Sequence, residues 1–296
     1  MGKDFLYFCI LRGIQVAKKY IAKLFINGVI QEKNEDYCQK WLLEKIEELG
    51  DDKKNVALVL FINSPGGSVY ESDEVYLAVK KYREDTKRPV YAYFANLAAS
   101  GGYYIGCSAQ KIIANRNTLT GSIGVIANKF VDITEFLTKH GIKSETIHAG
   151  RNKIMGSLDV PVTDEQRAIM QSIADECYEQ FTKIVAESRN MDIEKVKEIA
   201  DGRVYSALQA KSNSLVDEVM TFDEAIDFLK ESEFKDKEYK AEVKDFKYKP
   251  KKSLKNLLKG SVESLAPFSE LSAVLSFASS KVRYPAFLYE QPVAVL

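Results

Sequence analysis

Two patterns of apolar and polar residues alternate along the chain, one typical of strands and one typical of helices. Short apolar runs at residues 22–30 and 56–64 predict buried strands, and the i, i+3, i+4 spacing of apolar positions at 37–49 predicts a helix between them. The same alternation predicts further strands at 88–96, 111–115, 122–128 and 143–149, and further helices at 72–85, 101–107, 131–141 and 163–190. Strands separated by helices imply parallel pairing and an α/β fold.

We expect this α/β domain to cover residues 21–230, between an N-terminal segment 1–20 and a C-terminal segment 231–296. Two of its helices carry start signals. Ser72 is a candidate N-cap of the helix at 72–85. Thr163, followed three residues later by Gln166, forms a capping-box pattern at the start of the longest helix.

Composition excludes several classes of protein. Lys and Arg number 42 and so do Asp and Glu, so no global charge points to nucleic acid or to an acidic partner. The four cysteines (Cys9, Cys38, Cys107 and Cys177) are scattered, without a CxxC pair or clustered histidines. A zinc site or a disulfide framework is therefore not expected.

Each of the two end segments is a candidate for contact with a membrane. The apolar run at residues 5–11 is far shorter than the ~20 residues that span a bilayer, so we predict no transmembrane helix there, only a surface anchor or a packing segment. Residues 244–260 carry seven lysines and one aspartate. That segment is either a solvated basic linker or a segment resting on anionic lipid.

Two turns rich in small residues follow predicted strands and could hold an active site. In the first, Pro65 restricts the backbone and the pair Gly66–Gly67 allows amides to point outward, which suits either a tight turn or a binding site. In the second, Ser100 stands between a strand and a short helix. There it is either a plain N-cap or a nucleophile whose developing anion the helix end favours.

A nucleophilic serine needs a base, and histidine is the usual one. His140 is predicted at a helix end and His148 in a loop, and neither has an orienting aspartate nearby in sequence. A lysine base must lower its pKa from about 10.4 to about 7–8, which requires burial. Lys153 is one of the few lysines outside an obviously solvated run, and it precedes the apolar pair Ile154 and Met155.

Four blocks of sequence, taken in order, resemble the signal peptide peptidase A family of Ser/Lys peptidases. They are INSPGGSVYESDEVY (62–76), NLAASGGYYIGCSAQKIIANRNTLTGSIGV (96–125), HAGRNKIMGSLDVPVTDEQRAIMQ (148–171) and GRVYSALQAKSNSLVDEV (202–219). The resemblance implies the Clp protease/crotonase-like fold, an α/β fold of repeated ββα units with parallel sheets flanked by helices. Two positions depart from the family pattern: Ser214 stands where a glycine is usual, and Leu158 where a proline is often found.

The resemblance also implies a role for each site residue. Ser100 would be the nucleophile, Lys153 the general base, and Ser122 a hydroxyl that hydrogen-bonds and orients the lysine amine. The N–H groups of Gly67 and Gly101 would form the oxyanion hole. No metal and no cofactor are implied.

By the same resemblance, substrates are hydrophobic peptides such as cleaved signal-peptide remnants. The resemblance further implies a homo-oligomeric ring, such as an octamer, with each site completed by a neighbouring subunit. It also implies membrane association with the active site on the extracytoplasmic side. Two alternatives of other classes stay open: a non-catalytic scaffold of the same fold, and a crotonase-type acyl-CoA enzyme, which would normally use glutamates in place of the Ser/Lys pair.

Overall fold

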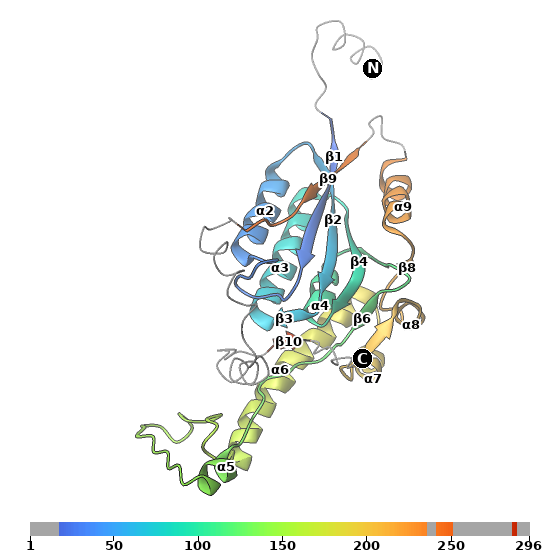
Figure 1. Cartoon of the computed structure of the whole chain (residues 1–296). Coiled ribbons are helices and arrows are strands. Elements are labelled where there is room, and N and C mark those ends of the chain that lie inside the picture. Colours follow the sequence, from blue (N-terminus) through green and yellow to red (C-terminus); the bar gives the residue numbers. More distant parts are fainter. Residues whose placement is uncertain (1–17, 236–240, 251–285, 289–296) are drawn as a thin grey trace, which may run out of the picture.

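A twisted sheet with helices on both faces forms the body of the molecule (Figure 1). The computed structural model describes residues 18–235, 241–250 and 286–288. In these ranges the strands are β1 (Tyr20–Asn27), β2 (Asn55–Ser64), β3 (Gly66–Ser68), β4 (Val90–Ala99), β5 (Lys111–Ala114), β6 (Leu119–Gly121), β7 (Val204–Ser206), β8 (Glu218–Val219), β9 (Glu242–Phe246) and β10 (Ala286–Leu288). The helices are α2 (Gln39–Asp51), α3 (Val69–Thr86), α4 (Gly101–Gly106), α5 (Thr134–Lys139), α6 (Asp164–Arg189), α7 (Ile193–Ile199), α8 (Ala207–Ser212) and α9 (Phe222–Phe234).

Parallel pairing dominates the main sheet, as the alternation of strands and helices predicted. Its order is β7-β6-β4-β2-β1-β9, and β5 pairs with both β4 and β8. Every pair in it is parallel except β6 with β7. The α/β fold class is therefore confirmed. Strand β3 stands apart and forms a small antiparallel sheet with β10.

The period of two along the strands divides the core into two layers. In β2, Leu58 and Leu60 face the larger layer, which contains α2, α3, α4 and part of α6, whereas Val59 faces a smaller layer under α9. Figure 1 shows α2 and α3 on one side of the sheet and α9 on the other. Strands buried on both faces read as nearly continuous apolar runs, which is why they stood out in the sequence.

The predicted N-cap is confirmed for α6 and is wrong for α3. Thr163 caps α6, and both hydrogen bonds of the capping box with Gln166 are present. Ser72 is not an N-cap: α3 begins one turn earlier, at Val69, and Ser68 is its N-cap. The Ser72 hydroxyl instead donates to the carbonyl of Ser68 within the first turn. Strand β3 ends at Ser68 and α3 begins at the next residue, Val69, so the helix starts before Ser72.

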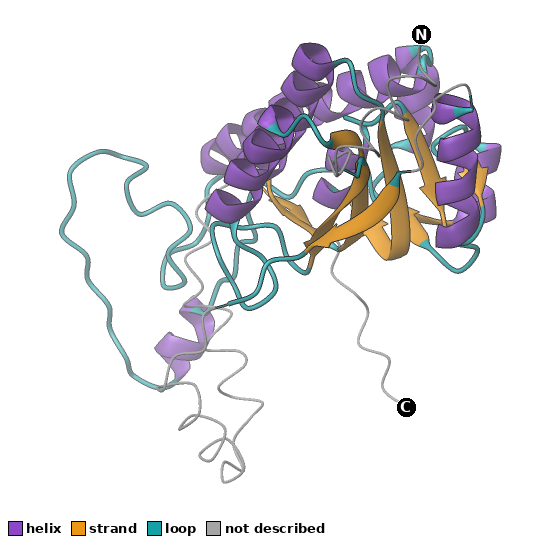
Figure 2. Cartoon of the chain, turned by 90° about the horizontal axis from the view of Figure 1, so that it is seen from above, coloured by secondary structure: helices purple, strands orange, loops and turns teal. Residues whose placement is uncertain are grey.

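Two predicted strands are wrong. The strand expected at 122–128 lies earlier, as the short β6, because Gly121 (φ +85°) and Ser122 (φ +51°) turn the chain away from the sheet. The segment 143–149 is exposed and irregular, and Ile147 is 95% exposed. A strand needs a neighbouring strand for its backbone groups, and none of the described residues supplies one there. Both segments belong to the long arm between β6 and α6, which reaches away from the sheet (Figures 1 and 2).

The two end segments of the sequence prediction are only partly described. Residues 1–17 and 251–285, which include most of the proposed surface anchor and part of the lysine-rich segment, lie outside the described residues. Strand β9 (Glu242–Phe246) joins the edge of the main sheet beside β1. The domain boundary at residue 230 stays a prediction. Among the described helices, none has the length and apolar character needed to cross a bilayer.

A buried ion pair joins α6 to the strand region near β8 and leads to a stability prediction. Arg189 Nη1 lies 2.8 Å from Asp217 Oδ2, and the two side chains are 7% and 20% exposed. Burial alone would raise the pKa of Asp217, but hydrogen bonds from Arg189 and from the Ile112 N–H outweigh it and hold that pKa below its usual 3.8. Arg189→Ala is expected to lower the free energy of unfolding by about 1.5–3 kcal/mol, because it removes a charged hydrogen bond from a largely buried carboxylate, which keeps Lys111 (3.2 Å) as its remaining charged partner.

Urea unfolding of Arg189→Ala at neutral pH measures this loss. Because the folded-state pKa of Asp217 is depressed, its contribution is present above about pH 4 and is lost as the pH falls through the folded-state value. The difference between wild type and Arg189→Ala should therefore shrink below pH 4. Lys81→Ala, which breaks an exposed pair with Asp85, is the matched control and should cost less than about 1 kcal/mol. Equal losses for the two variants would contradict the assignment.

Candidate active site

Ser100 occupies a strained turn between β4 and α4. Its backbone has φ +53° and ψ −118°, a region that residues other than glycine rarely enter. The hydroxyl is buried and has no hydrogen-bond partner among the described residues, although the carbonyl of Ser100 accepts the Tyr104 N–H at 2.9 Å. A serine held on a sharp strand-to-helix turn is the arrangement that presents a nucleophile in other hydrolases.

Gly67 and Gly101 lie side by side next to this turn. A Cβ atom placed on Gly101 would lie 3.2 Å from the backbone nitrogen of Gly67 and 2.4 Å from the Ser72 hydroxyl. A Cβ placed on Gly67 would lie 1.8 Å from the carbonyl oxygen of Ile30. Neither position has room for a side chain, so both backbones approach their neighbours more closely than any other residue would allow.

Ser122 lies at the end of the neighbouring strand. Ala99 pairs with Gly121 in the parallel β4–β6 ladder, and the Ser100 N–H donates to the Gly121 carbonyl at 2.8 Å. Ser100 and Ser122 therefore follow directly after paired strand ends. Ser122 is buried, and its own N–H donates to the carbonyl of Arg203.

Lys153 is not brought to Ser100 within the chain. It is exposed, in a turn closed by a hydrogen bond from its N–H to the Gly150 carbonyl, and it belongs to the arm between β6 and α6. Figures 1 and 2 show this arm extending away from the sheet and from α4. The structure thus gathers four of the five sequence-predicted site residues (Ser100, Ser122, Gly67 and Gly101) and leaves the fifth apart. The role of each stays a prediction.

The two histidines and the buried cysteine offer no alternative pair. His140 and His148 are both exposed on the same arm, and the ring nitrogen Nδ1 of His140 lies 2.8 Å from the Phe136 carbonyl. Cys107 ends α4, but burial raises the pKa of its thiol to about 12, so the thiolate is disfavoured. Within the described part of the chain, no cluster of His, Cys, Asp and Glu could hold a metal ion.

A buried network that the sequence did not reveal holds the helix after Ser100. The Tyr104 hydroxyl donates to Asp73 Oδ1 at 2.6 Å and lies 2.7 Å from Gln180 Nε2. Burial, followed by the hydrogen bond to Asp73, raises the pKa of Tyr104, so the phenol stays protonated. These contacts tie α4 to α3, which follows Gly67, and to α6. The only signal in the sequence was a tyrosine pair in a short apolar helix, and the partners lie 31 and 76 residues away.

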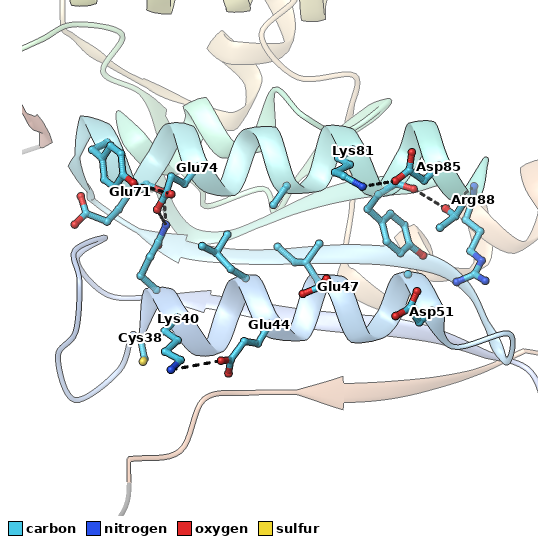
Figure 3. A pocket seen from close by; sticks show the side chains of 18 of the residues that line it. Cys38, Lys40, Glu44, Glu47, Asp51, Glu71, Glu74, Lys81, Asp85 and Arg88 are labelled. Carbon is cyan, nitrogen blue, oxygen red and sulfur yellow. Dashed lines mark hydrogen bonds and ion pairs between the residues drawn. The ribbon is translucent and has the colours of Figure 1, made fainter.

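Two cavities differ in whether the predicted site residues line them. A groove of about 1370 Å³ lies between α2 and α3 and is lined mainly by charged side chains, including the pairs Lys40–Glu44 and Lys81–Asp85 (Figure 3). None of the five site residues lines it. A smaller pocket of about 430 Å³ has Ser122 in its wall, together with residues of α6. Of these two cavities, the smaller one and not the larger touches a predicted site residue.

Comparison with known proteins shows the family to which the chain belongs. The model of peptidase family S49 matches residues 82–235, more than half of the chain, and the Clp protease model matches residues 16–127. The chain is 38% identical over 221 residues to a putative signal peptide peptidase SppA of Enterococcus faecium, covering 72% of this chain and 64% of that protein. It is 39% identical over 208 residues to a putative protease of Synechocystis, covering 70% and 72%. The chain belongs to peptidase family S49.

Membership of family S49 places the chain among the serine peptidases, and the match to the Clp protease model confirms the predicted fold. A third relative is the chloroplastic serine protease SPPA of Arabidopsis thaliana, 33% identical over 207 residues. The match covers 70% of this chain and 30% of the Arabidopsis protein. The S49 match contains Ser100, Ser122, Lys153 and Gly101, and Gly67 falls within the Clp protease match.

Proposed function

We propose that the chain is a serine endopeptidase with a Ser100/Lys153 dyad. The observation that carries the proposal is the buried Ser100 hydroxyl, which has no partner among the described residues and lies on a strained turn beside Gly67 and Gly101, in a chain of family S49. Ser122 orients the lysine amine, and the N–H groups of the two glycines form the oxyanion hole. Family membership favours this reading over an acyl-CoA enzyme or a scaffold.

The reaction follows from these roles. Lys153, in its neutral form, takes the hydroxyl proton of Ser100, and the Ser100 oxygen attacks the peptide carbonyl carbon. The oxyanion accepts hydrogen bonds from Gly67 and Gly101 while the proton moves from the lysine to the leaving amine. The C–N bond then breaks and leaves an ester on Ser100. Water, deprotonated by the same lysine, attacks the ester carbonyl, and the lysine passes that proton to the Ser100 oxygen as the ester C–O bond breaks and the acid product leaves.

A neighbouring copy of the chain supplies the lysine in this proposal. Within one chain Lys153 is exposed on the arm, and the Ser100 hydroxyl lacks a hydrogen-bond partner among the described residues. The arm also exposes large apolar side chains: Phe136 is 57% exposed, Ile142 52% and Ile147 95%. Exposed apolar groups gathered on one segment mark a surface that binds protein. A homo-oligomeric ring, such as an octamer, would cover them and bring each Lys153 to the next Ser100.

The substrates we propose are extended hydrophobic peptides, such as signal-peptide remnants. The name of the Enterococcus relative, a putative signal peptide peptidase, supports this class. Such peptides would pair with strand edges at the turns of Gly67 and Ser122 and place small apolar side chains in nearby pockets. We further propose membrane association with the active site on the extracytoplasmic side, with a membrane surface as partner and no nucleic acid.

A fluorophosphonate probe tests the nucleophile directly. We expect one adduct per chain, mapped to Ser100 by peptide mass spectrometry and absent from Ser100→Ala. Ser108→Ala is the matched control, because Ser108 is also buried just after α4 but its hydroxyl donates to the Ile105 carbonyl. Labelling that persists in Ser100→Ala, or that is lost in Ser108→Ala alone, would overturn the proposal.

A further inference from the structure

Tyr104 joins the two segments that carry Gly67 and Gly101. Its hydroxyl donates to Asp73 Oδ1 at 2.6 Å. Asp73 lies in the second turn of α3, a helix that begins two residues after Gly67. Tyr104 itself lies in α4, three residues after Gly101. This hydrogen bond therefore links the segment of Gly67 to the segment of Gly101.

The starts of α3 and α4 touch at the same place. A Cβ atom on Gly101 would lie 2.4 Å from the Ser72 hydroxyl, so α4 begins directly against the first turn of α3. The Tyr104 N–H donates to the Ser100 carbonyl at 2.9 Å and closes the turn that carries the serine. The rings of Tyr76 and Tyr104 pack edge to face, with centroids 5.5 Å apart. Tyr104 thus contacts α3 through both its ring and its hydroxyl.

Gln180 fixes the direction of the Tyr104 hydroxyl. A phenol has one hydrogen to donate. The Gln180 side-chain amide donates to the phenol oxygen at 2.7 Å, which leaves the phenol hydrogen for Asp73. Burial, followed by the hydrogen bond to Asp73, raises the pKa of Tyr104 well above its ordinary value. The bond from Tyr104 to Asp73 therefore keeps its hydrogen throughout the pH range of an enzyme assay.

We propose that Tyr104 is a positioning residue that sets the spacing of the two oxyanion-hole amides through its hydrogen bond to Asp73. The proposal rests on the proposed function, which gives the N–H groups of Gly67 and Gly101 their role. Donors stabilise an oxyanion only when they lie about 2.7–3.1 Å from the place where its charge develops. Two donors on separate segments keep that geometry only while the segments are fixed to each other, and the bond from Tyr104 to Asp73 fixes them.

Tyr104→Phe tests the proposal, because it removes the hydroxyl and keeps the ring against Tyr76. We expect kcat for a fluorogenic apolar peptide to fall about 10- to 100-fold, since a displaced donor stabilises the transition state less than a well-placed one. KM should stay within about twofold, because the oxyanion forms in the transition state and not in the bound substrate. A kcat within about twofold of the wild-type value would overturn the proposal.

Tyr103→Phe is the matched control on the same helix. Tyr103 is also buried, and its hydroxyl donates to the Leu215 carbonyl at 2.8 Å, which lies before β8 and not on α3. Because that carbonyl is buried, urea unfolding should show at least as large a loss of stability for Tyr103→Phe as for Tyr104→Phe. Its kcat should nevertheless stay within about threefold of wild type. An equal fall in kcat for both variants would overturn the proposal.

Variants at Asp73 test the other end of the bond. Asp73→Asn keeps an acceptor oxygen for the phenol and should keep kcat within about threefold, whereas Asp73→Ala should match Tyr104→Phe. The double variant Tyr104→Phe/Asp73→Ala should be no slower than either single variant, because both changes remove the same interaction. Falls in kcat that multiply in the double variant would show two independent roles and contradict the link.

Hydrogen exchange separates this proposal from the one on which it rests, because it follows the backbone without any reaction. By mass spectrometry, Tyr104→Phe should speed exchange in both 66–76 and 100–107, and Tyr103→Phe should leave 66–76 unchanged. If the wild type hydrolyses no peptide but this pattern appears, the peptidase proposal fails and the link between the two glycine segments stands. If the wild type hydrolyses peptide and Tyr104→Phe changes neither exchange nor kcat, the link fails and the peptidase stands.

Discussion

Replacing Ser100 with alanine is expected to lower kcat for hydrolysis of an apolar peptide by about 10⁴-fold or more, because the acyl-enzyme can no longer form. The measurement is turnover of a fluorogenic apolar peptide under saturating conditions, wild type against Ser100→Ala. The circular dichroism spectrum should not change, because the hydroxyl makes no hydrogen bond to the part of the chain that the structure describes.

A matched variant shows whether the loss comes from chemistry. Thr120 lies on β6 beside the same strand ends, and its buried hydroxyl donates to the Ala98 carbonyl at 2.6 Å. Thr120→Val is expected to reduce stability while retaining most of the turnover. If Ser100→Ala still turned over peptide at the wild-type rate, Ser100 would not be the nucleophile.

Lys153→Ala is expected to be as inactive as Ser100→Ala, and a mixture of the two variants is expected to regain activity. If each site takes its serine from one chain and its lysine from the next, random assortment in a ring restores roughly a quarter of the sites. The two variants are dissociated together, reassembled and assayed against each variant treated alone. Peptide turnover is the readout, and light scattering gives the oligomeric state.

The outcomes of this mixing experiment separate the two arrangements. No regained activity, with mixed rings shown by mass spectrometry, would mean that each chain uses its own lysine after the arm refolds onto its own site. Full activity of Lys153→Ala alone would remove the lysine from the mechanism. A monomer at micromolar concentration would contradict the ring itself. Lys143→Ala, on the same arm and also exposed, is the control that should keep wild-type turnover.

Much of the fold could be predicted from the sequence because its strongest signals are local. Strands buried on both faces give continuous apolar runs, and the capping box of Thr163 and Gln166 is a four-residue pattern that works by itself. The start of α3 was misplaced at Ser72 because the decisive feature was the preceding strand β3, only three residues long. Predicting that strand requires its partner strands, which lie far away in sequence.

The site could be predicted only in part for a similar reason. The resemblance pointed to Ser100, Ser122 and the two glycines, and their neighbourhood follows from the parallel pairing of β4 with β6 and the close approach of β3. The position of Lys153 could not be predicted, because the arm that carries it reaches away from the sheet and meets the start of α6 through polar contacts, Arg151 with Glu165 and Asn152 with Gln166. The segment 143–149 was misread as a strand for the same reason.

One departure from the family pattern has a structural explanation. Ser214 stands where the family usually has glycine, and its backbone has φ +59°, the left-handed region that glycine enters without a steric cost. A serine there is strained by about 1–2 kcal/mol. The turn is held nonetheless, since the Ser214 carbonyl accepts the Arg189 Nε–H at 2.8 Å.

The arm between β6 and α6 has a consequence for when the protein becomes active. On the proposed arrangement, a newly made chain carries a nucleophile without a base and a base without a nucleophile, so it is inert until copies meet. Proteolysis then depends on the local abundance of the chain, and dilution switches it off without any inhibitor. An enzyme organised in this way protects its surroundings during its own synthesis.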